Sequence, residues 1–423
     1  MQRNNVLVIS NNCFSLSNSN GRTLGNLFVG WPKSQLAQFC VIAQDPNWDI
    51  CDNYYCLEDK SVLKSFFRCR NAVGRRLYKQ ESTNISSDTV RANVGRKTLY
   101  KVVVRELIWS RKRWYSKQFQ QWLDDFNPDQ LVFQLGDSIF MFNIALDIAT
   151  SRNIPLIIYN TEGYYFFPRN WHQKSLGDDL LFKLYRRVYR KRVEAMMQVA
   201  SHCIHLNDKL KDDYDKAFNV QSSVIYNSYS VSKSKELLFS TNTPRISYLG
   251  NLGLDRDSAL IEIGAVLQEI NSDYYIDIYG RADEIMQQRF KTAPGVNYMG
   301  LVSYEEVKDI ISQSDILFHV ETDRGYYERQ LQYAFTTKIA DSLASGRCFV
   351  VYAPKQLACS QYVIKNNCGW VATNKKELRA AFHSVINDDE LRIAIINKAL
   401  EVAYQNHNLT QNASKFQEIL LSI

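Results

Sequence analysis

The stretch AFTTKIADSLASG, residues 334–346, combines residue types that bind phosphate and hydroxyl groups. Thr336 is expected to be the N-cap of a helix, which leaves the N–H groups of Thr337 and Lys338 without helical acceptors at the positive end of the helix dipole. Asp341 follows one turn later, about 4 to 6 Å along the axis. This helix end could hold a phosphate and a ribose diol together. The same residue types are, however, also common at the ends of helices that bind no ligand.

A second candidate binding loop is YLGNLGLDR at 248–256, directly after an expected strand. Gly250 and Gly253 would let the backbone approach a ligand closely, and Arg256 could clamp a diphosphate. The first half of the chain has similar strand ends. We expect Gly21 and Arg22 at the tip of a loop after the first strand, and Asn227 in VIYNS at the end of the last strand.

The elements that must position these residues alternate between short β-branched runs and longer helical patterns. Strands are expected at 6–10, 131–135, 155–159, 245–249, 275–279, 316–320 and 348–352. This alternation predicts an α/β protein with two Rossmann-like domains of parallel sheet, facing each other across a cleft. Ligands bind at the carboxyl ends of strands in such sheets, where the candidate residues lie.

The series of strands breaks once, in the Ser/Thr/Lys-rich segment 227–245, which we interpret as the interdomain linker. We therefore predict an N-terminal acceptor-binding domain at 1–235, a C-terminal nucleotide-sugar-binding domain at 236–400 and a final helix at 401–423. The total of 423 residues is ample for two hydrophobic cores.

Composition narrows the class of protein. The nine cysteines lack metal-ligand spacing, which favours reduced core thiols in a cytosolic protein. A strand begins almost at once, so no signal peptide is expected, and Asp137 and Asp147 interrupt the most apolar long stretch, 131–149, so no transmembrane helix is expected. No paired aspartates suit a divalent ion, so we expect neither a metal nor a cofactor.

Positive charge is concentrated in one part of the sequence. The formal net charge is +7, yet residues 64–117 hold 15 Lys/Arg against 3 Asp/Glu, interleaved with Phe, Tyr and Trp, and KLYRRVYRKR at 183–192 repeats this composition. Such surfaces suit the headgroups of an anionic membrane. A merely solvated charged face and RNA binding are the alternatives, but no RNA-binding motif accompanies the patch.

The chain resembles the GT-B glycosyltransferases, specifically the family 4-like retaining enzymes of bacterial surface-polysaccharide assembly such as capsule and lipopolysaccharide. The resemblance covers essentially the whole chain and is clearest in ISYLGNLG, IYG (278–280), VNYMGLVSYEEV (296–307), FTTKIADSLASG and VVYAP (350–354). It implies a GT-B fold, with the C-terminal helix packing back on the first domain.

The resemblance also implies residue roles. In those enzymes a helix ending in Glu-Ala-x-Ala-x-Gly places its acid on the donor ribose, and Asp341, five residues before Gly346, occupies that place. A preceding turn gives backbone N–H groups to the donor diphosphate, a role that falls on Phe335, Thr336, Thr337 and Lys338.

The sequence departs from the family at the sugar-contacting residues. The first glutamate of the family aligns with Tyr333, so Glu321 or Glu328 would have to replace it. A family histidine after a first-domain strand has its nearest counterpart in Glu162, with Asp137 as a second candidate. His319 and His172 are expected to be structural.

The implied activity is a retaining, metal-independent hexosyl transfer from a nucleotide-sugar to a lipid-linked or oligosaccharide acceptor. The protein would be cytoplasmic and peripheral on the inner face of the cell membrane. Lys338 and Arg256 would stabilise the leaving diphosphate. The alternatives are a sugar-nucleotide epimerase, a non-catalytic protein and a nucleic-acid-binding protein on the same scaffold.

Overall fold

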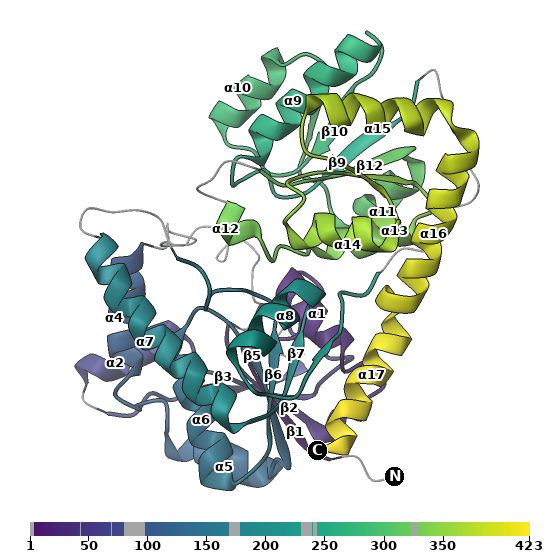
Figure 1. Ribbon diagram of the computed structural model, residues 1–423. Coiled ribbons are helices and arrows are strands. Elements are labelled where there is room, and N and C mark those ends of the chain that lie inside the picture. Colours follow the sequence, from purple (N-terminus) through teal and green to yellow (C-terminus); the bar gives the residue numbers. More distant parts are fainter. Residues whose placement is uncertain are drawn as a thin grey trace. The chain divides into compact units, whose positions relative to one another are not determined.

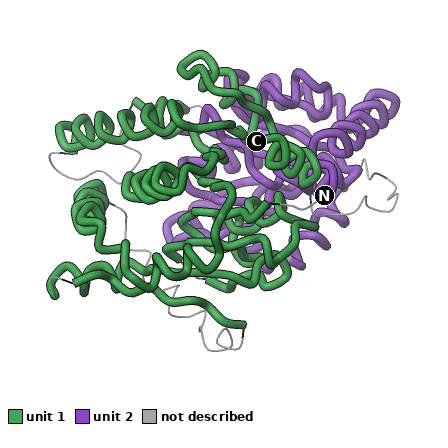
Figure 2. Tube along the Cα trace, turned by 90° about the horizontal axis from the view of Figure 1, so that it is seen from below, with its two compact units in different colours: residues 1–226, 412–423 green, residues 227–411 purple. Residues whose placement is uncertain are grey.

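The computed structural model describes residues 4–42, 44–68, 70–79, 98–168, 178–229, 239, 243–322 and 328–423. The chain forms two compact units (Figure 2), the first comprising 1–226 and 412–423 and the second 227–411. The chain therefore crosses to the second unit near residue 226, and its end returns to the first.

The first unit is an eight-stranded sheet with helices on both faces (Figure 1). Its strand order is β4-β3-β2-β1-β5-β6-β7-β8, and every pair is parallel except the antiparallel edge pair β3–β4. The strands are β1 (Val6–Asn12), β2 (Leu36–Ile42), β3 (Asn53–Cys56), β4 (Arg75–Leu77), β5 (Gln130–Leu135), β6 (Leu156–Asn160), β7 (Ala200–His205) and β8 (Ser222–Val224). The helices are α1 (Ser19–Asn26), η1 (Lys33–Gln35), α2 (Asp59–Phe67), α4 (Leu99–Trp109), α5 (Lys117–Phe126), α6 (Ile139–Arg152), α7 (Asp178–Val199), α8 (Asp208–Ala217) and α17 (Leu409–Ser422).

Successive side chains of a strand point to opposite faces of the sheet, so a hydrophobic core forms on each face. Val6 and Val8 of β1 pack in one buried cluster with Leu24 of α1 and with Phe416 and Leu420 of α17. The C-terminal helix thus packs back on the first unit, as the resemblance implied. On the other face, rings of β5, α6 and α7 meet, with Phe133 5.2 Å from Phe142 and Phe142 5.4 Å from Tyr189 between centroids.

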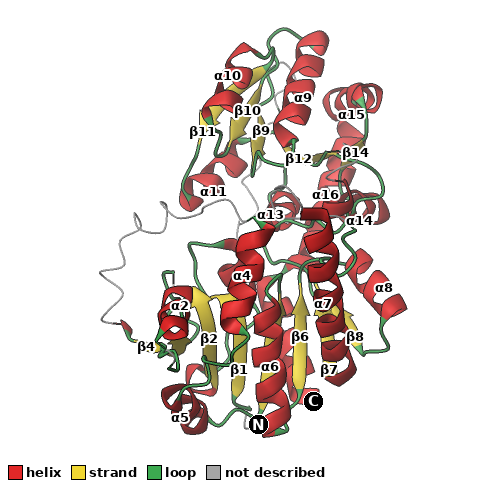
Figure 3. Ribbon diagram, turned by 90° about the vertical axis from the view of Figure 1, so that its left-hand side faces the viewer, coloured by secondary structure: helices red, strands yellow, loops and turns green. Residues whose placement is uncertain are grey.

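The second unit is a six-stranded, wholly parallel sheet in the order β11-β10-β9-β12-β13-β14 (Figure 3). Its strands are β9 (Ile246–Leu249), β10 (Ile276–Tyr279), β11 (Val296–Gly300), β12 (Ile316–Val320), β13 (Cys348–Tyr352) and β14 (Trp370–Ala372). Its helices are α9 (Arg256–Ile270), α10 (Glu284–Thr292), α11 (Tyr304–Gln313), α12 (Glu328–Leu331), α13 (Thr337–Ala344), α14 (Ala358–Asn366), α15 (Lys375–Asn387) and α16 (Asp389–His407). This is the strand order of doubly wound nucleotide-binding sheets.

One core cluster of the second unit joins β9, β10, β12, β13 and β14 to α9, α10 and α15. The β-branched and aromatic residues of the strands are almost wholly buried, as a parallel sheet covered on both faces requires. Helix α13 lies against β12 and α16. This packing fixes the start of α13 beside the carboxyl end of β12.

The seven strands expected from the sequence are confirmed as β1, β5, β6, β9, β10, β12 and β13. The loop expected after β1 is wrong in part, because Gly21 and Arg22 lie inside α1, where the Asn18 side chain caps the Gly21 N–H. The eight described cysteines are all buried free thiols. Within the described residues, no helix is both long enough and apolar enough to cross a membrane.

Candidate functional site

The strand order of the second unit reverses direction between β9 and β12. The helix that follows β9 leads toward β10 on one side, whereas β12 and its successors lie on the other. A crevice forms at such a switch point, outside the carboxyl ends of the two central strands. Three segments meet there: the loop 250–255, the end of β12 at Glu321 and the start of α13.

A buried ion pair joins the first two segments. Arg256, the first residue of α9, donates from Nε to Oε2 of Glu321 at 2.9 Å and from Nη2 to Oε1 at 3.0 Å. Its third nitrogen, Nη1, donates to the Gly253 carbonyl at 3.1 Å. The side chains are 9% and 0% exposed, so this bidentate pair is shielded from solvent.

The electrostatics of this pair reflect both burial and attraction. Burial lowers the pKa of Arg256, but the adjacent Glu321 carboxylate outweighs it and the net pKa is raised. Burial raises the pKa of Glu321, and Arg256 opposes that rise. Arg256 was predicted to clamp a diphosphate, and the structure shows its guanidinium already engaged by protein acceptors.

His319 and Lys338 belong to the same cluster. The His319 Nε2 lies 3.5 Å from Oε1 of Glu321 and has no hydrogen-bond partner within the described residues. Burial, together with the charges of Arg256 and Lys338, lowers the pKa of His319 to about 3. The imidazole is therefore neutral, and the positive charges around the end of β12 come from Arg256 and Lys338.

The start of α13 has the predicted form. Thr336 is the N-cap residue, with extended backbone angles of φ −78° and ψ 156°, and the helix runs from Thr337 to Ala344. The Thr336 Oγ1 makes no capping bond, and this buried atom has no partner among the described residues. Asp341 lies one turn into the helix and is only 5% exposed.

The loop before α13 is supported by Asn227. Its Nδ2 donates to the Phe335 carbonyl at 3.0 Å, and its own carbonyl accepts from His407 at 2.6 Å. Asn227 was predicted on the acceptor side of the first domain, but it lies in the second unit and positions the residue before the N-cap. The physical reason is that the strand β8 ends earlier, at Val224, so Asn227 lies beyond the sheet.

Glycines let the backbone segments at the carboxyl ends of β9 and β10 approach each other closely. A Cβ on Gly280 would lie 2.3 Å from the Gly250 carbonyl, so these two backbones can approach only without a side chain. Gly250 N–H donates to Tyr279 and Gly280 N–H to Gly300, both at 2.9 Å. Gly253, the other predicted glycine, lies in the same loop, and its N–H donates to Asn251.

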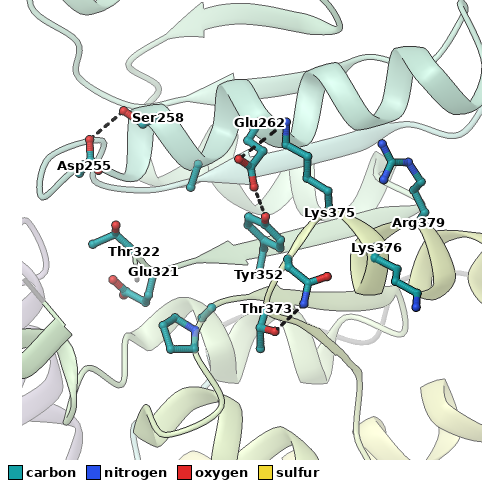
Figure 4. A pocket seen from close by; sticks show the side chains of 14 residues that line it. Asp255, Ser258, Glu262, Glu321, Thr322, Tyr352, Thr373, Lys375, Lys376 and Arg379 are labelled. Atoms are coloured by element: carbon teal, nitrogen blue, oxygen red, sulfur yellow. Dashed lines mark hydrogen bonds and ion pairs between the residues drawn. The ribbon is translucent and has the colours of Figure 1, made fainter. Parts of the chain in front are cut away.

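A pocket of about 520 Å³ opens beside this site (Figure 4). Glu321 and Thr322 form one wall, at the end of β12, and Asp255 and Ser258 lie at the start of α9. The opposite wall is basic and comes from α15; it consists of Lys375, Lys376 and Arg379. Sequence reasoning missed this pocket, since only the sheet topology brings β12, β13, β14 and α9 together.

Two acids of the first unit lie at the ends of adjacent strands, Asp137 after β5 and Glu162 after β6. The surrounding protein desolvates Glu162 and raises its pKa to about 7, and the nearby Asp137 adds to the rise. The Glu162 side chain is nevertheless exposed at the surface, so it keeps contact with solvent. The structure thus brings together the two acids that the sequence proposed for this domain.

A polar network holds the Glu162 loop. The Asn160 Oδ1 accepts from the Glu162 N–H at 3.3 Å, and the Asn160 amide lies 3.3 Å from Nδ1 of His205. Burial lowers the pKa of His205 to about 3, so this ring is neutral. Neither Asn160 nor His205 was identified from the sequence, because each is the last residue of a strand whose neighbour in the sheet no local pattern predicts.

The sequence-predicted residues therefore separate into two groups. Gly250, Gly253, Arg256 and Glu321 join the start of α13 (Phe335–Lys338) and Asp341 in the second unit. Asp137 and Glu162 lie together in the first unit, where Gly21 and Arg22 belong to α1 instead.

Tyr333 is buried before α13, the described backbone places Glu328 at the start of α12, and His172 lies outside the described residues. In the described ranges, no three His, Cys, Asp or Glu side chains form a metal-binding group.

Comparisons with known proteins agree with this architecture. Residues 264–418 match the model of a family described as glycosyl transferase-like. HepE from Anabaena, solved in complex with UDP, is 12% identical with a TM-score of 0.62, over 99% of this chain and 100% of that one. No curated protein matches the sequence.

Two further solved structures are similar over nearly the full length. The sucrose-phosphate synthase of Thermosynechococcus elongatus is 11% identical with a TM-score of 0.62, covering 99% of each chain. WaaG, a glycosyltransferase involved in lipopolysaccharide biosynthesis, is 12% identical with a TM-score of 0.55, covering 98% of this chain and 99% of WaaG. The fold is that of the GT-B glycosyltransferases, as the sequence resemblance implied.

Proposed function

We propose that this protein is a glycosyltransferase that takes a sugar from a nucleotide-sugar donor held by the second unit. The observation that carries the proposal is the start of α13 at the switch point of the sheet. There, N-terminal N–H groups, the unpaired Thr336 Oγ1, Lys338 and the buried Asp341 lie within the N-cap and the first five residues of the helix. Phosphate groups bind at helix N-termini of this kind, and a carboxylate one turn on suits a ribose diol.

Each group has a distinct role in the proposed reaction. The N–H groups of Thr337 and Lys338 and the Lys338 ammonium stabilise the negative charge that develops on the leaving diphosphate. Arg256, neutralised in part by Glu321, shapes the loop 250–255 against which the diphosphate lies. Gly250 and Gly280 allow the close backbone approach that shapes the loop after β9. HepE was solved with UDP and with UDP-glucose, which supports a donor of this class.

The proposal extends to the stereochemistry of transfer, the sugar and the acceptor. Transfer is retaining and independent of a metal ion, and the sugar is a hexose. Glu162 and Asp137 serve the acceptor, where a carboxyl with a raised pKa can exchange a proton with a hydroxyl. The acceptor is a glycan carried on a lipid, which is presented at the inner face of the cell membrane. The match to WaaG is consistent with a polysaccharide product.

The reaction products distinguish glycosyl transfer from epimerisation of a nucleotide-sugar by a protein of the same fold. The purified protein is incubated with UDP-, GDP- and ADP-linked hexoses and a lipid extract, and nucleotides are separated by chromatography. A transferase releases the nucleoside diphosphate, and addition of the extract increases the release. Conversion of one nucleotide-sugar into another, without diphosphate release, would identify an epimerase instead. Absence of both reactions with every donor would contradict the proposal.

A further inference from the structure

Two helices that are remote in the sequence enclose the short loop that follows β5. This strand ends at Leu135 and α6 begins at Ile139, so Asp137 lies between them in the loop 136–138. Helix α4 contacts α6 and α7, α6 also contacts α7, and the three helices lie together in Figure 3. Side chains of α4 and α7 therefore reach the loop that carries Asp137.

Ser138 is the N-cap residue of α6, yet its hydroxyl does not cap the helix. A serine at this position normally accepts a hydrogen bond from a backbone N–H of the first turn. Here the side chain makes no capping bond, and Oγ instead donates to Oδ1 of Asp137 at 3.2 Å. The same Oγ accepts from Nη1 of Arg105, on α4, at 3.0 Å. The hydroxyl thus links a guanidinium to the acid.

Glu106 of α4 caps α6 in place of Ser138. Its Oε1 accepts from the Ile139 N–H at 2.9 Å, and its Oε2 accepts from the Phe140 N–H at 2.8 Å. The helix dipole favours a carboxylate at this end of α6. Burial raises the pKa of Glu106 to about 7, and the Phe140 N–H and Arg105 oppose the rise. A fold that required only a capped α6 would use the serine and would not bury this carboxyl.

Arg105 is itself held in one orientation. Its Nε donates to Oδ1 of Asp59 at 2.9 Å, and Nε1 of Trp109 donates to the same oxygen at 2.8 Å. The guanidinium lies 4.7 Å from the centroid of the Phe140 ring, and the Trp109 ring stacks on Phe140 with 4.1 Å between centroids. These contacts direct Nη1 of Arg105 to Ser138.

The backbone of the loop is fixed from the side of α7. The Tyr189 hydroxyl donates to the Gly136 carbonyl at 2.9 Å, and the Tyr185 hydroxyl donates to the Asp137 carbonyl. Both tyrosines are buried, whereas Asp137 is only half-buried. The loop therefore holds an accessible carboxylate on a backbone that α7 immobilises.

We propose that Ser138 is a positioning residue that orients the Asp137 carboxylate toward the acceptor, and that Glu106 and Arg105 keep its hydroxyl in this role. The inference rests on the proposed function, in which Asp137 serves the acceptor. The observation that carries it is the exchange of partners at the start of α6. The serine that should cap the helix bonds the acid, and a glutamate from another helix makes the cap.

The first test measures amide hydrogen exchange of the full-length protein at Ile139 and Phe140. Glu106→Gln should accelerate exchange there by about fivefold, because the amide nitrogen that replaces one carboxylate oxygen cannot accept a hydrogen bond. Ser138→Ala should leave both rates unchanged. Equal acceleration by the two substitutions would overturn the proposal, since Ser138 would then be an ordinary cap. This readout does not depend on activity.

The second test measures release of the nucleoside diphosphate with the donors and lipid extract described above. Ser138→Ala should lower kcat about tenfold, because one hydrogen bond to a charged group is lost. The KM for the donor should be unchanged, because the proposed donor site lies in the second unit. Ser138→Thr keeps the hydroxyl and should restore most of kcat.

The matched control is Ser116→Ala in the same unit. Ser116 is the N-cap residue of α5, its Oγ accepts from the Phe119 N–H at 3.2 Å, and it is 3% exposed, as is Ser138. As an ordinary cap, it should lower the midpoint of urea unfolding when replaced and leave kcat unchanged. Ser138→Ala should show the opposite pattern.

The outcomes separate this inference from the proposed function. Diphosphate release by the wild type and by Ser138→Ala at equal rates would overturn the positioning role alone. A fall in kcat that Ser138→Thr does not restore, or that Ser116→Ala reproduces, would also overturn it. A wild type that releases no diphosphate from any donor would overturn the proposed function and, with it, this role of Ser138.

Discussion

Arg256 and Glu321 show how single residues organise the candidate site. Each charge would be costly to bury alone, but the bidentate geometry satisfies both. The pair ties the start of α9 to the end of β12, which are the two sides of the switch point. Its removal should therefore disturb both the stability and the shape of the site.

We predict that Glu321→Ala lowers the free energy of unfolding by about 3–5 kcal/mol, because Arg256 is left buried without its counter-ion. Urea denaturation followed by circular dichroism measures this change. The control is Glu401→Ala, which removes an exposed partner of Lys398 and should have little effect. A loss no larger than that of the control would show that the pair does not stabilise the fold.

The burial of His319 predicts that the free energy of unfolding depends on pH. Its pKa is lowered from 6.5 to about 3 in the folded protein, so the neutral ring contributes stability above pH 6.5. This contribution is lost as the pH falls from 6.5 toward 3, by about 1.4 kcal/mol per pH unit. We expect His319→Asn to flatten the fall in unfolding free energy between pH 6.5 and 4.5. Parallel pH curves for wild type and variant would contradict the assignment.

Among the elements, the loop that enters α9 carries backbone strain. Leu254 and Asp255 both have positive φ, of 61° and 65°, a conformation that costs an ordinary side chain roughly 1–2 kcal/mol. Such strain is concentrated at functional sites, and this loop lies beside Arg256. Contacts around the loop, such as the bond from Arg256 to the Gly253 carbonyl, maintain this strained conformation.

We predict that Leu254→Gly raises the unfolding free energy by about 0.5–1 kcal/mol, because glycine adopts positive φ without steric cost. Thermal and urea unfolding measure the gain. The control, Ile393→Gly at an exposed position of α16 beyond its first turn, should instead lose about 1 kcal/mol. If both substitutions destabilise equally, the loop is not strained.

Local patterns account for what the sequence predicted. The long β-branched runs became buried strands, and the cap and first turn of α13 were readable because they depend on adjacent residues only. The strand β14 is three residues long and gave no periodic signal, whereas the last strand of the first half was expected to end in VIYNS and instead ends earlier, as β8 at Val224. Partners distant in sequence, such as Arg256 and Glu321, or Asn160 and His205, require the strand order, which no local pattern encodes.

At the scale of the whole molecule, each unit has its own core, yet the chain end belongs to the first. Phe416 and Leu420 of α17 are fully buried with β1, and the Leu420 carbonyl accepts from Gln130 at 2.8 Å. Residues of α17 therefore form part of the core of the first unit.

We predict that Phe416→Ala destabilises the first unit by about 3–5 kcal/mol, since it leaves a cavity beside β1. Differential scanning calorimetry should show the first unit unfolding earlier while donor-dependent stabilisation of the second unit remains. Leu421→Ala, at a 42% exposed position of the same helix, is the control and should change little. An equal effect of the two substitutions would argue against a core role for α17.

The most direct test of the donor site is calorimetric titration with uridine, guanosine and adenosine diphosphates. We expect one of them to bind, and Asp341→Asn to weaken its affinity by about 10- to 100-fold through loss of charge-assisted hydrogen bonds to the ribose. Asp309→Asn, at an exposed position of α11, serves as the control and should bind like the wild type. Binding of none of the three, or equal affinity of wild type and Asp341→Asn, would contradict a nucleotide-sugar site at the start of α13.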